Sequence, residues 1–542
     1  MAAFTGLGKV IRLALRRDRL KLPLTILLLA GMFFALTASV VEVYGGSPAE
    51  RAAYATTSAV STVAIAFNGP VLGDSLGSVA FTETFTFFAI FVALATTLLV
   101  IRHTRQNEEH GRMELLGAAV IGRHVPLTAA LVIAAGFAVL IGGAVALSFV
   151  LHGLPFSGSL LAGTAMTFIS LSFAGIAAVT AQLTRTARAA NGLAAATIGA
   201  AFLVRALGDI QGEAQPGGVS ATSGWLSWLS PIGIARNARP FAENQWWVIG
   251  ILVAICIAFL ALGYWLASRR DLGTGLLPSK SGRATARGYL LSTFGLAFRL
   301  QRGIWLGWCV GISVLAVTLG AVAEEVGKFS ENSEQTAQII AALGGTASLT
   351  EAYLSFALLL FGVAAVAYSI QATLRVRSEE ASGHLEMHLA TQTHRSTIFI
   401  SHAVLVAIGA FLLLIVAGAT AGLTYGLVIG EPLQQTGGLL LATLNYFPAV
   451  LLFVGLTLLA LGWFPAGAAA ASWLLFAASY FILQFSQLLQ FPTWVEQLSP
   501  LTHIPQLPAE QFAALPLLVL SGIGIAAGLA GIWRFTSRDM TT

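Results

Sequence analysis

Charged residues are scarce in this chain of 542 amino acids. Lys and Arg number 29 and Asp and Glu number 24, so only 10% of the residues carry charge, against about 25% in ordinary soluble domains. So few charges cannot cover the surface of a soluble enzyme, and disordered chains are poor in apolar residues. Here apolar residues make up 56%, at a mean hydropathy of +0.81. The composition therefore predicts an integral membrane protein.

Motifs for nucleotide or metal binding are also missing. The sequence contains no G-x-x-x-x-G-K-[ST] phosphate loop and no His/Cys/Asp/Glu cluster with metal-ligand spacing. Its two cysteines, Cys256 and Cys309, cannot build a disulfide framework. No segment predicted to face the cytoplasm exceeds about 35 residues, which is too short for a nucleotide-binding domain. Energy for any transport must come from an ion gradient or from a separate ATPase chain.

Long uncharged runs predict an all-α membrane protein. A membrane-spanning helix needs about 20 mostly apolar residues, and residues 22–41, 125–151 and 246–268 carry no charge. The strands of a membrane barrel would be short and alternating. We expect about twelve spans, at residues 22–44, 80–101, 126–151, 158–182, 189–207, 246–267, 303–323, 351–374, 398–428, 439–462, 465–485 and 515–534.

The distribution of Lys and Arg predicts the orientation. Positive residues accumulate in cytoplasmic segments of membrane proteins. With the N-terminus inside, the inner segments hold 24 of the 29 Lys and Arg and the outer segments hold five. We therefore expect a multi-pass protein of the plasma membrane, in contact with lipid, with both termini in the cytoplasm. The net charge of +5 is explained by this topology, and no nucleic-acid partner is expected.

The sequence contains an internal repeat, with similar motifs in the same order in each half. Six spans in each half is an even number, so both halves enter from the same side and form parallel repeats, an arrangement found in transporters. The boundary is expected in the basic stretch 273–288, which gives repeats of residues 1–280 and 281–542. The matching pairs are Leu13–Arg16 with Leu296–Arg299, Thr82-Glu83 with Thr350-Glu351, Glu108–Glu114 with Glu379–Glu386 (one residue inserted), Trp225 and Ser230-Pro231 with Trp494 and Ser499-Pro500, and Arg270-Asp271 with Arg538-Asp539.

Two inner loops carry clustered acids where Lys and Arg would be expected. In each, a Glu-Glu pair precedes a glycine, which permits a sharp turn, and a short stretch with apolar residues such as Met113 follows. A short amphipathic helix flanked by acids suits docking of a partner that presents arginines. A solvated turn joining two spans is the alternative, but a mere linker need not repeat this order of residues.

The sequence of these loops resembles that of a known family of membrane proteins. The pattern Arg-x-x-Glu-Glu…Gly-Arg-x-Glu-Leu-Leu, which begins at Arg105, resembles the loop between spans two and three of ATP-binding-cassette exporter permeases of the ABC-2 class. In that class this loop carries the coupling helix that contacts the ATPase. The whole chain resembles the fused twelve-span subgroup of polyketide-antibiotic exporters of the tetronasin type.

The resemblance implies a permease subunit, and not an enzyme, that exports hydrophobic or amphiphilic compounds such as antibiotics. Two copies of an ATP-binding-cassette ATPase would bind ATP and Mg, and this chain would hold no cofactor or metal. His384 stands where the first loop has Arg112, which implies unequal contacts with the two ATPases. The coupling residues implied by the resemblance are Glu108, Glu109, Gly111, Arg112, Glu114, Glu379, Glu380, Gly383, His384 and Glu386.

The N-terminal residues 7–20 read as a basic interfacial helix. Arg12, Arg16 and Arg19 alternate there with apolar residues. The resemblance implies a connecting helix that touches the ATPase, and anchoring in lipid is an equally good interpretation. The resemblance also implies short re-entrant helices at the outer exit, in segments 208–245 and 486–514.

Several residues near the outer ends of spans are candidates for a pathway or gate. Arg205 and Asp209 have the i, i+4 spacing of a helical ion pair, so they form either a structural pair or a gate. Glu83 and Glu351 each follow a Thr, as in a capped first helical turn, or they handle substrate or protons. Aromatic residues that could line an apolar path, or simply pack, are Phe85, Phe88, Tyr353 and Phe356.

Two other functions were weighed. An ion-driven secondary transporter also uses two six-span repeats, but it needs acids or histidines near the membrane midplane, where the predicted spans are nearly free of charge. A membrane enzyme acting on lipid would need catalytic groups clustered at one face, and the sequence offers none.

Overall fold

Helices form the framework of the computed structural model, which describes residues 4–117, 120–215, 217–271, 273–277, 285–331, 349–381, 383–486 and 491–538. Within them no β-strand is present. In the described ranges, eleven helices are long and apolar enough to cross a membrane, and the shorter apolar helix Ala468–Gln484 lies at the predicted eleventh span. The expectation of an all-α integral membrane protein is confirmed.

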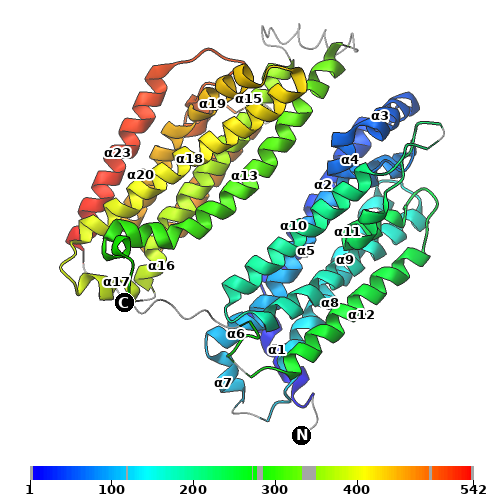
Figure 1. The fold of residues 1–542 in the computed structure, drawn as a ribbon, viewed down its shortest axis with the longest axis horizontal. Helices are drawn as coiled ribbons and strands as arrows, with labels where there is room; N and C mark the ends of the chain where they lie inside the picture. Colours follow the sequence, from blue (N-terminus) through cyan, green and yellow to red (C-terminus); the bar gives the residue numbers. More distant parts are fainter. Residues whose placement is uncertain are drawn as a thin grey trace. The chain divides into compact units, whose positions relative to one another are not determined.

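The chain divides into two compact units, Met1–Gly282 and Arg283–Thr542 (Figure 1). Each unit has its own hydrophobic core, one drawn from residues 29–252 and the other from residues 312–535. The predicted boundary between residues 280 and 281 falls in 278–284, outside the described residues. Asp539, part of the last repeated pair, also lies outside them.

The first unit is built around α9, which packs against α5, α8, α10 and α12. Short helices flank the two ends of this bundle: α3 and α4 lie at one end and α1, α6 and α7 at the other (Figure 1). Its helices are α1 (Leu7–Arg17), α2 (Lys21–Tyr44), α3 (Pro48–Val60), α4 (Thr62–Asn68), α5 (Leu76–His103), α6 (Arg105–Glu109), α7 (Arg112–Gly117), α8 (Val125–Leu151), α9 (Phe156–Leu183), α10 (Ala187–Ile210), η1 (Trp225–Leu229), α11 (Pro231–Asn237) and α12 (Trp247–Ser268).

The second unit repeats the order of long helices with two differences. A single helix, α13, stands where the first unit has α1 and α2, and the counterpart of α9 is broken into α19 and α20. Pro448 lies in the first turn of α20. Because proline has no N–H, it cannot continue the backbone hydrogen bonds of α19, and the helix is interrupted there. Its helices are η2 (Gly288–Leu291), α13 (Thr293–Glu331), α15 (Leu349–Thr373), α16 (Arg375–Ala381), α17 (His384–Leu389), α18 (Arg395–Ile429), α19 (Pro432–Leu444), α20 (Phe447–Trp463), α21 (Ala468–Phe485), α22 (Thr493–Glu496), η3 (Pro500–His503) and α23 (Ala514–Ser537).

Helices α20 and α23 approach each other so closely that glycine is required at their crossing. A Cβ atom added to Gly455 would lie 1.9 Å from the carbonyl oxygen of Gly524. Small residues let membrane helices pack backbone to backbone, so this pair fixes α23, the last span, against the core of its unit.

Candidate functional site

Each unit carries, at the end of its second long helix, two short helices joined at a glycine. Gly111 separates α6 from α7 with φ 68°, and Gly383 precedes α17 with φ 74°. This left-handed conformation is strained for residues with a side chain and free for glycine. The turn predicted at each of these glycines is confirmed.

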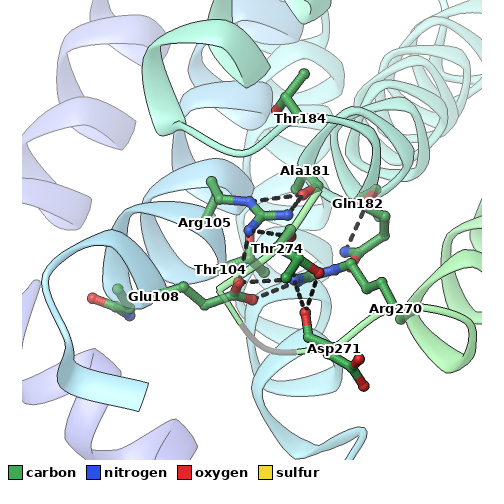
Figure 2. A network of polar contacts seen from close by, with 12 residues as sticks. Thr104, Arg105, Glu108, Ala181, Gln182, Thr184, Arg270, Asp271 and Thr274 are labelled. Carbon is green, nitrogen blue, oxygen red and sulfur yellow. Dashed lines mark hydrogen bonds and ion pairs between the residues drawn. The ribbon is translucent and has the colours of Figure 1, made fainter. Parts of the chain in front are cut away.

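In the first unit, Glu108 lies between two arginines (Figure 2). Arg105 donates from Nη1 to Glu108 Oε2 at 2.9 Å. From the end of α12, Arg270 donates from Nη2 to Oε1 at 2.5 Å and from Nη1 to Oε2 at 2.9 Å. The side chains of Arg105 and Glu108 are 0% and 9% exposed, so this carboxylate is engaged inside the protein.

The same arginines hold the end of α9. Arg105 donates from Nε and Nη2 to the carbonyl oxygen of Ala181, at 2.9 and 2.6 Å. Arg270 donates from Nε to Gln182 Oε1 at 2.5 Å (Figure 2). Three long helices, α5, α9 and α12, are therefore joined through this group of side chains, directly beside α7.

The second unit repeats the arrangement. Arg377 Nη1 lies 3.0 Å from Glu380 Oε2, and Arg538, just beyond α23, donates from Nη2 to Glu380 Oε1 at 2.7 Å. The Glu380 side chain is 4% exposed. We call each set, Arg105–Glu108–Arg270 and Arg377–Glu380–Arg538, an arginine clamp.

The clamps correct the sequence alignment of the two loops. The sequence comparison aligned Glu108 with Glu379 and needed one inserted residue. The ion pairs show instead that Glu108 corresponds to Glu380. The same interval separates Arg105 from Arg377 and Gly111 from Gly383, so no insertion is needed.

The remaining acids of the Glu-Glu pairs have different partners in the two units. Glu109 accepts a hydrogen bond at 2.9 Å from the backbone N–H of Ala187, the first residue of α10, where a helix favours negative charge. Glu379 pairs with Arg375 at 2.8 Å, and its other oxygen lies 3.4 Å from His384 Nδ1. Of the four acids in the two Glu-Glu pairs, Glu108 and Glu380 are therefore the two that correspond.

A further arginine fastens each clamp to the start of the next span. Arg123 donates from Nη2 to the carbonyl oxygens of Ser268 and Arg270, at 2.9 and 3.2 Å. In the second unit, Arg395 donates from Nη1 to the carbonyl oxygen of Arg538 at 2.8 Å. Sequence reasoning did not assign a role to Arg123 or Arg395, because neither lies in one of the repeated motifs.

Outside the clamps, α7 and α17 present exposed polar residues. Arg112 and Glu114 are exposed on α7, and His384 and Glu386 are exposed on α17. Met113 and Leu385 point inward and are 7% and 2% exposed. Each short helix is thus anchored by an apolar residue and shows charged or titratable groups to its surroundings.

The predicted N-terminal helix forms as α1 and packs against α8 at the same end of the unit as α7. The buried Asp18 ends it, because that carboxylate pairs with Arg102 and with His103 Nε2, the latter at 2.8 Å. Arg12, Arg16 and Arg19 are all exposed, as an interfacial helix requires.

At the opposite end of the first unit, Arg205 and Asp209 form the predicted pair. Arg205 Nη1 lies 3.1 Å from Asp209 Oδ2, and both side chains are 0% exposed. Arg205 also donates from Nη2 to the carbonyl oxygens of Ala66 and Phe67, at 2.6 and 3.1 Å. These carbonyls end α4 and have no partner within the helix, so Arg205 caps α4.

Glu83 has a different position from the one expected. Helix α5 begins at Leu76, and Ser75 caps it by accepting from Ser78 N at 3.1 Å, so the prediction that Thr82 caps this helix is wrong. Glu83 accepts hydrogen bonds from Tyr54 and Asn68, which join α3 and α4 to α5. Glu351 does lie in the first turn of its helix, α15.

The candidate pathway aromatics occupy mixed environments. Phe85 and Phe88 are buried in the core of the first unit, with ring centroids 4.4 Å from Phe81 and 4.6 Å from Phe33 respectively. Tyr353 donates to the carbonyl oxygen of Leu319 at 3.1 Å, and Phe356 is 43% exposed. Their role in a pathway stays a prediction.

Comparison with known proteins gives two matches. The family model for the C-terminal domain of the multidrug efflux system permease Rv1217c matches residues 290–536. The multidrug efflux system permease protein Rv1217c of Mycobacterium tuberculosis is 34% identical over 539 residues, which cover 99% of this chain and 96% of the relative. The chain therefore belongs to the family of multidrug efflux permeases that includes Rv1217c.

Proposed function

We propose that this chain is the membrane subunit of an ATP-driven drug exporter of the ABC-2 class, and that two separate ATPase subunits dock at α7 and α17. The observation that carries the proposal is the arginine clamp beside each short helix. In the first unit, Arg105, Glu108 and Arg270 join the ends of α5, α9 and α12. A force applied to α7 would therefore reach three spans together.

The partner ATPases would hydrolyse ATP, and this chain would form the pathway through the membrane. ATP and Mg would bind to the ATPases, and the hydrolysis cycle would bias two states of the permease. The acids in the clamps are already engaged, so the docking contacts fall to the exposed residues Arg112, Glu114, His384 and Glu386. Hydrophobic and amphiphilic compounds are the proposed cargo, and polyketide antibiotics are the first to test because of the resemblance to that subgroup.

Transport by inside-out membrane vesicles tests the proposal. Vesicles containing this chain and its co-expressed ATPase should take up a fluorescent amphiphilic dye when given ATP, and not when given a non-hydrolysable analogue. Ionophores that collapse ion gradients should leave this uptake intact. Uptake that ignores ATP and follows an imposed ion gradient would overturn the proposal in favour of a secondary transporter.

A double charge reversal separates docking from folding. Glu114→Lys with Glu386→Lys changes two exposed residues, so the protein should insert normally but lose most of its ATP-dependent uptake and its co-purification with the ATPase. Reversing Glu380 would be less informative, because that residue is 4% exposed between two arginines. Glu213→Lys is the matched control, an exposed acid outside α7 and α17 that should leave uptake unchanged.

A further inference from the structure

A cavity of about 340 Å³ lies between α1, α7 and α8 of the first unit. Its walls are mostly apolar and include Val10 and Leu13 from α1, Met113 from α7, and Ala129 and Ala130 from α8. This volume falls within the range of about 300–1,000 Å³ typical of ligand sites. The cavity could thus hold part of an apolar chain.

Two arginines line the same cavity and meet at a neutral acceptor. Arg17 and Arg112 both donate to Asn107 Oδ1, at 2.5 and 3.4 Å. Among the residues that the structure describes, neither arginine forms an ion pair. The neighbouring carboxylate of Asp18 is buried and already paired with Arg102 and His103.

The two positive charges of the arginine pair repel each other. Burial lowers the pKa of Arg17, and the charges of Arg112 and Arg102 lower it further, while Asp18 opposes the shift. Two guanidinium groups that share one neutral acceptor would be stabilised by an anion between them, since charge-assisted hydrogen bonds to phosphate suit arginine.

The second unit supplies an internal comparison. The equivalent space between α13, α17 and α18 measures only about 40 Å³. At equivalent positions, Leu300 stands for Arg17, Ile398 for Pro126 and His402 for Ala130. His402 Nδ1 lies 3.0 Å from Gln301 Nε2, so larger side chains fill this space. Neither arginine is kept, because His384 stands for Arg112. The combination of apolar space and paired arginines belongs to the first unit.

We propose that an anionic phospholipid binds here, with its phosphate between Arg17 and Arg112 and an acyl chain in the cavity. Helix α1 is amphipathic and is followed directly by the first span at Lys21, which places the site where headgroups meet acyl chains. Basic pockets between membrane helices commonly bind anionic headgroups. Arg112 also belongs to the proposed docking surface, so the site is tested on the permease without the ATPase.

Native mass spectrometry of the purified full-length protein tests the site. In mixed micelles the wild-type protein should retain phosphatidylglycerol over phosphatidylcholine by roughly tenfold or more, because two arginines favour a headgroup with net negative charge and repel the positive choline group. Ala130→Leu, which fills the cavity, and the double variant Arg17→Gln with Arg112→Gln should each lose one bound phosphatidylglycerol. Arg188→Gln, which changes an exposed arginine of α10 outside the cavity lining, should retain it.

Three results would overturn the proposal. The first is equal retention of the two lipids by the wild-type protein, a comparison that needs no variant to fold. The second is unchanged phosphatidylglycerol retention in both the cavity variant and the arginine variant. The third is thermal stabilisation by inorganic phosphate equal to that by phosphatidylglycerol, which would assign the arginines to a free anion and leave the cavity without a lipid.

Discussion

Among single residues, Glu108 is the acid on which the first clamp depends. Its carboxylate accepts from Arg105 and Arg270, and the three side chains are 9%, 0% and 8% exposed. Removing one partner of a buried ion pair costs about 3–5 kcal/mol, because the remaining charge is left uncompensated. Glu108→Ala should therefore lower the free energy of unfolding by that order, and thermal unfolding in detergent would show a clearly lower Tm.

The control for this substitution is Glu114→Ala, which removes an exposed acid six residues along the chain. Exposed substitutions of this kind change stability by about 0.5 kcal/mol or less. If Glu108→Ala and Glu114→Ala unfold at the same temperature, the arginine clamp contributes nothing to stability.

The sequence located the loops but could not divide their acids into buried and exposed. Glu108 and Glu109 are neighbours of identical chemistry, yet one lies inside a clamp and the other binds the backbone of α10. That division depends on where Arg270 lies, and no local pattern connects residues so far apart in the chain. The glycine turns were predictable because their cause is local.

At the scale of helices, α4 depends on a residue from another element. Arg205 of α10 donates to the carbonyl oxygens of Ala66 and Phe67 at the end of α4. Arg205→Leu should release these carbonyls and let the last turn of α4 open locally. Hydrogen exchange followed by mass spectrometry should then show faster exchange over residues 62–69, with little change in α8 and α9.

Arg188→Leu is the matched control, because it makes the same change at an exposed position of the same helix. It should leave exchange over residues 62–69 as in the wild-type protein. Equal protection of this segment in Arg205→Leu would mean that α4 is held by packing alone.

Helix positions followed from the sequence, but helix breaks did not. All twelve predicted spans lie on helices because long apolar runs report them directly. The repeated motifs at Leu13–Arg16 and Leu296–Arg299 look alike, yet α1 ends at Arg17 whereas α13 continues. The difference coincides with the buried Asp18, which binds Arg102 and His103. Such a break depends on partners from a distant helix, so periodicity alone misses it.

For the whole molecule, the sequence predicts two repeats, but it could not predict how their cavities differ. The ordered matches predicted two repeats, and each compact unit has its own core. The two equivalent cavities nevertheless measure about 340 and 40 Å³. That contrast arises from a few substitutions, such as His402 for Ala130, whose effect depends on the packed neighbours.

The proposed repeats predict that the chain can be divided at their junction. Co-expressed fragments 1–280 and 281–542 should each insert, because each keeps six spans, and Arg283 and Arg287 can hold the start of the second fragment in the cytoplasm. The two fragments together should restore resistance to an exported drug, and neither should do so alone. Co-purification through a tag on one fragment, with drug susceptibility of the cells, measures this.

A break elsewhere in the chain separates this prediction from a general tolerance of nicks. Division between Gly153 and Leu154 cuts the connection from α8 to α9, which pack closely within one core, and it leaves an odd number of spans in the first fragment. The second fragment would then begin outside and would have to translocate its own N-terminus, with no preceding span to carry it across the membrane. This pair should fail to restore resistance. Equal rescue by both divisions, or no rescue by either, would show that the junction near residue 280 is not a boundary between repeats that fold independently.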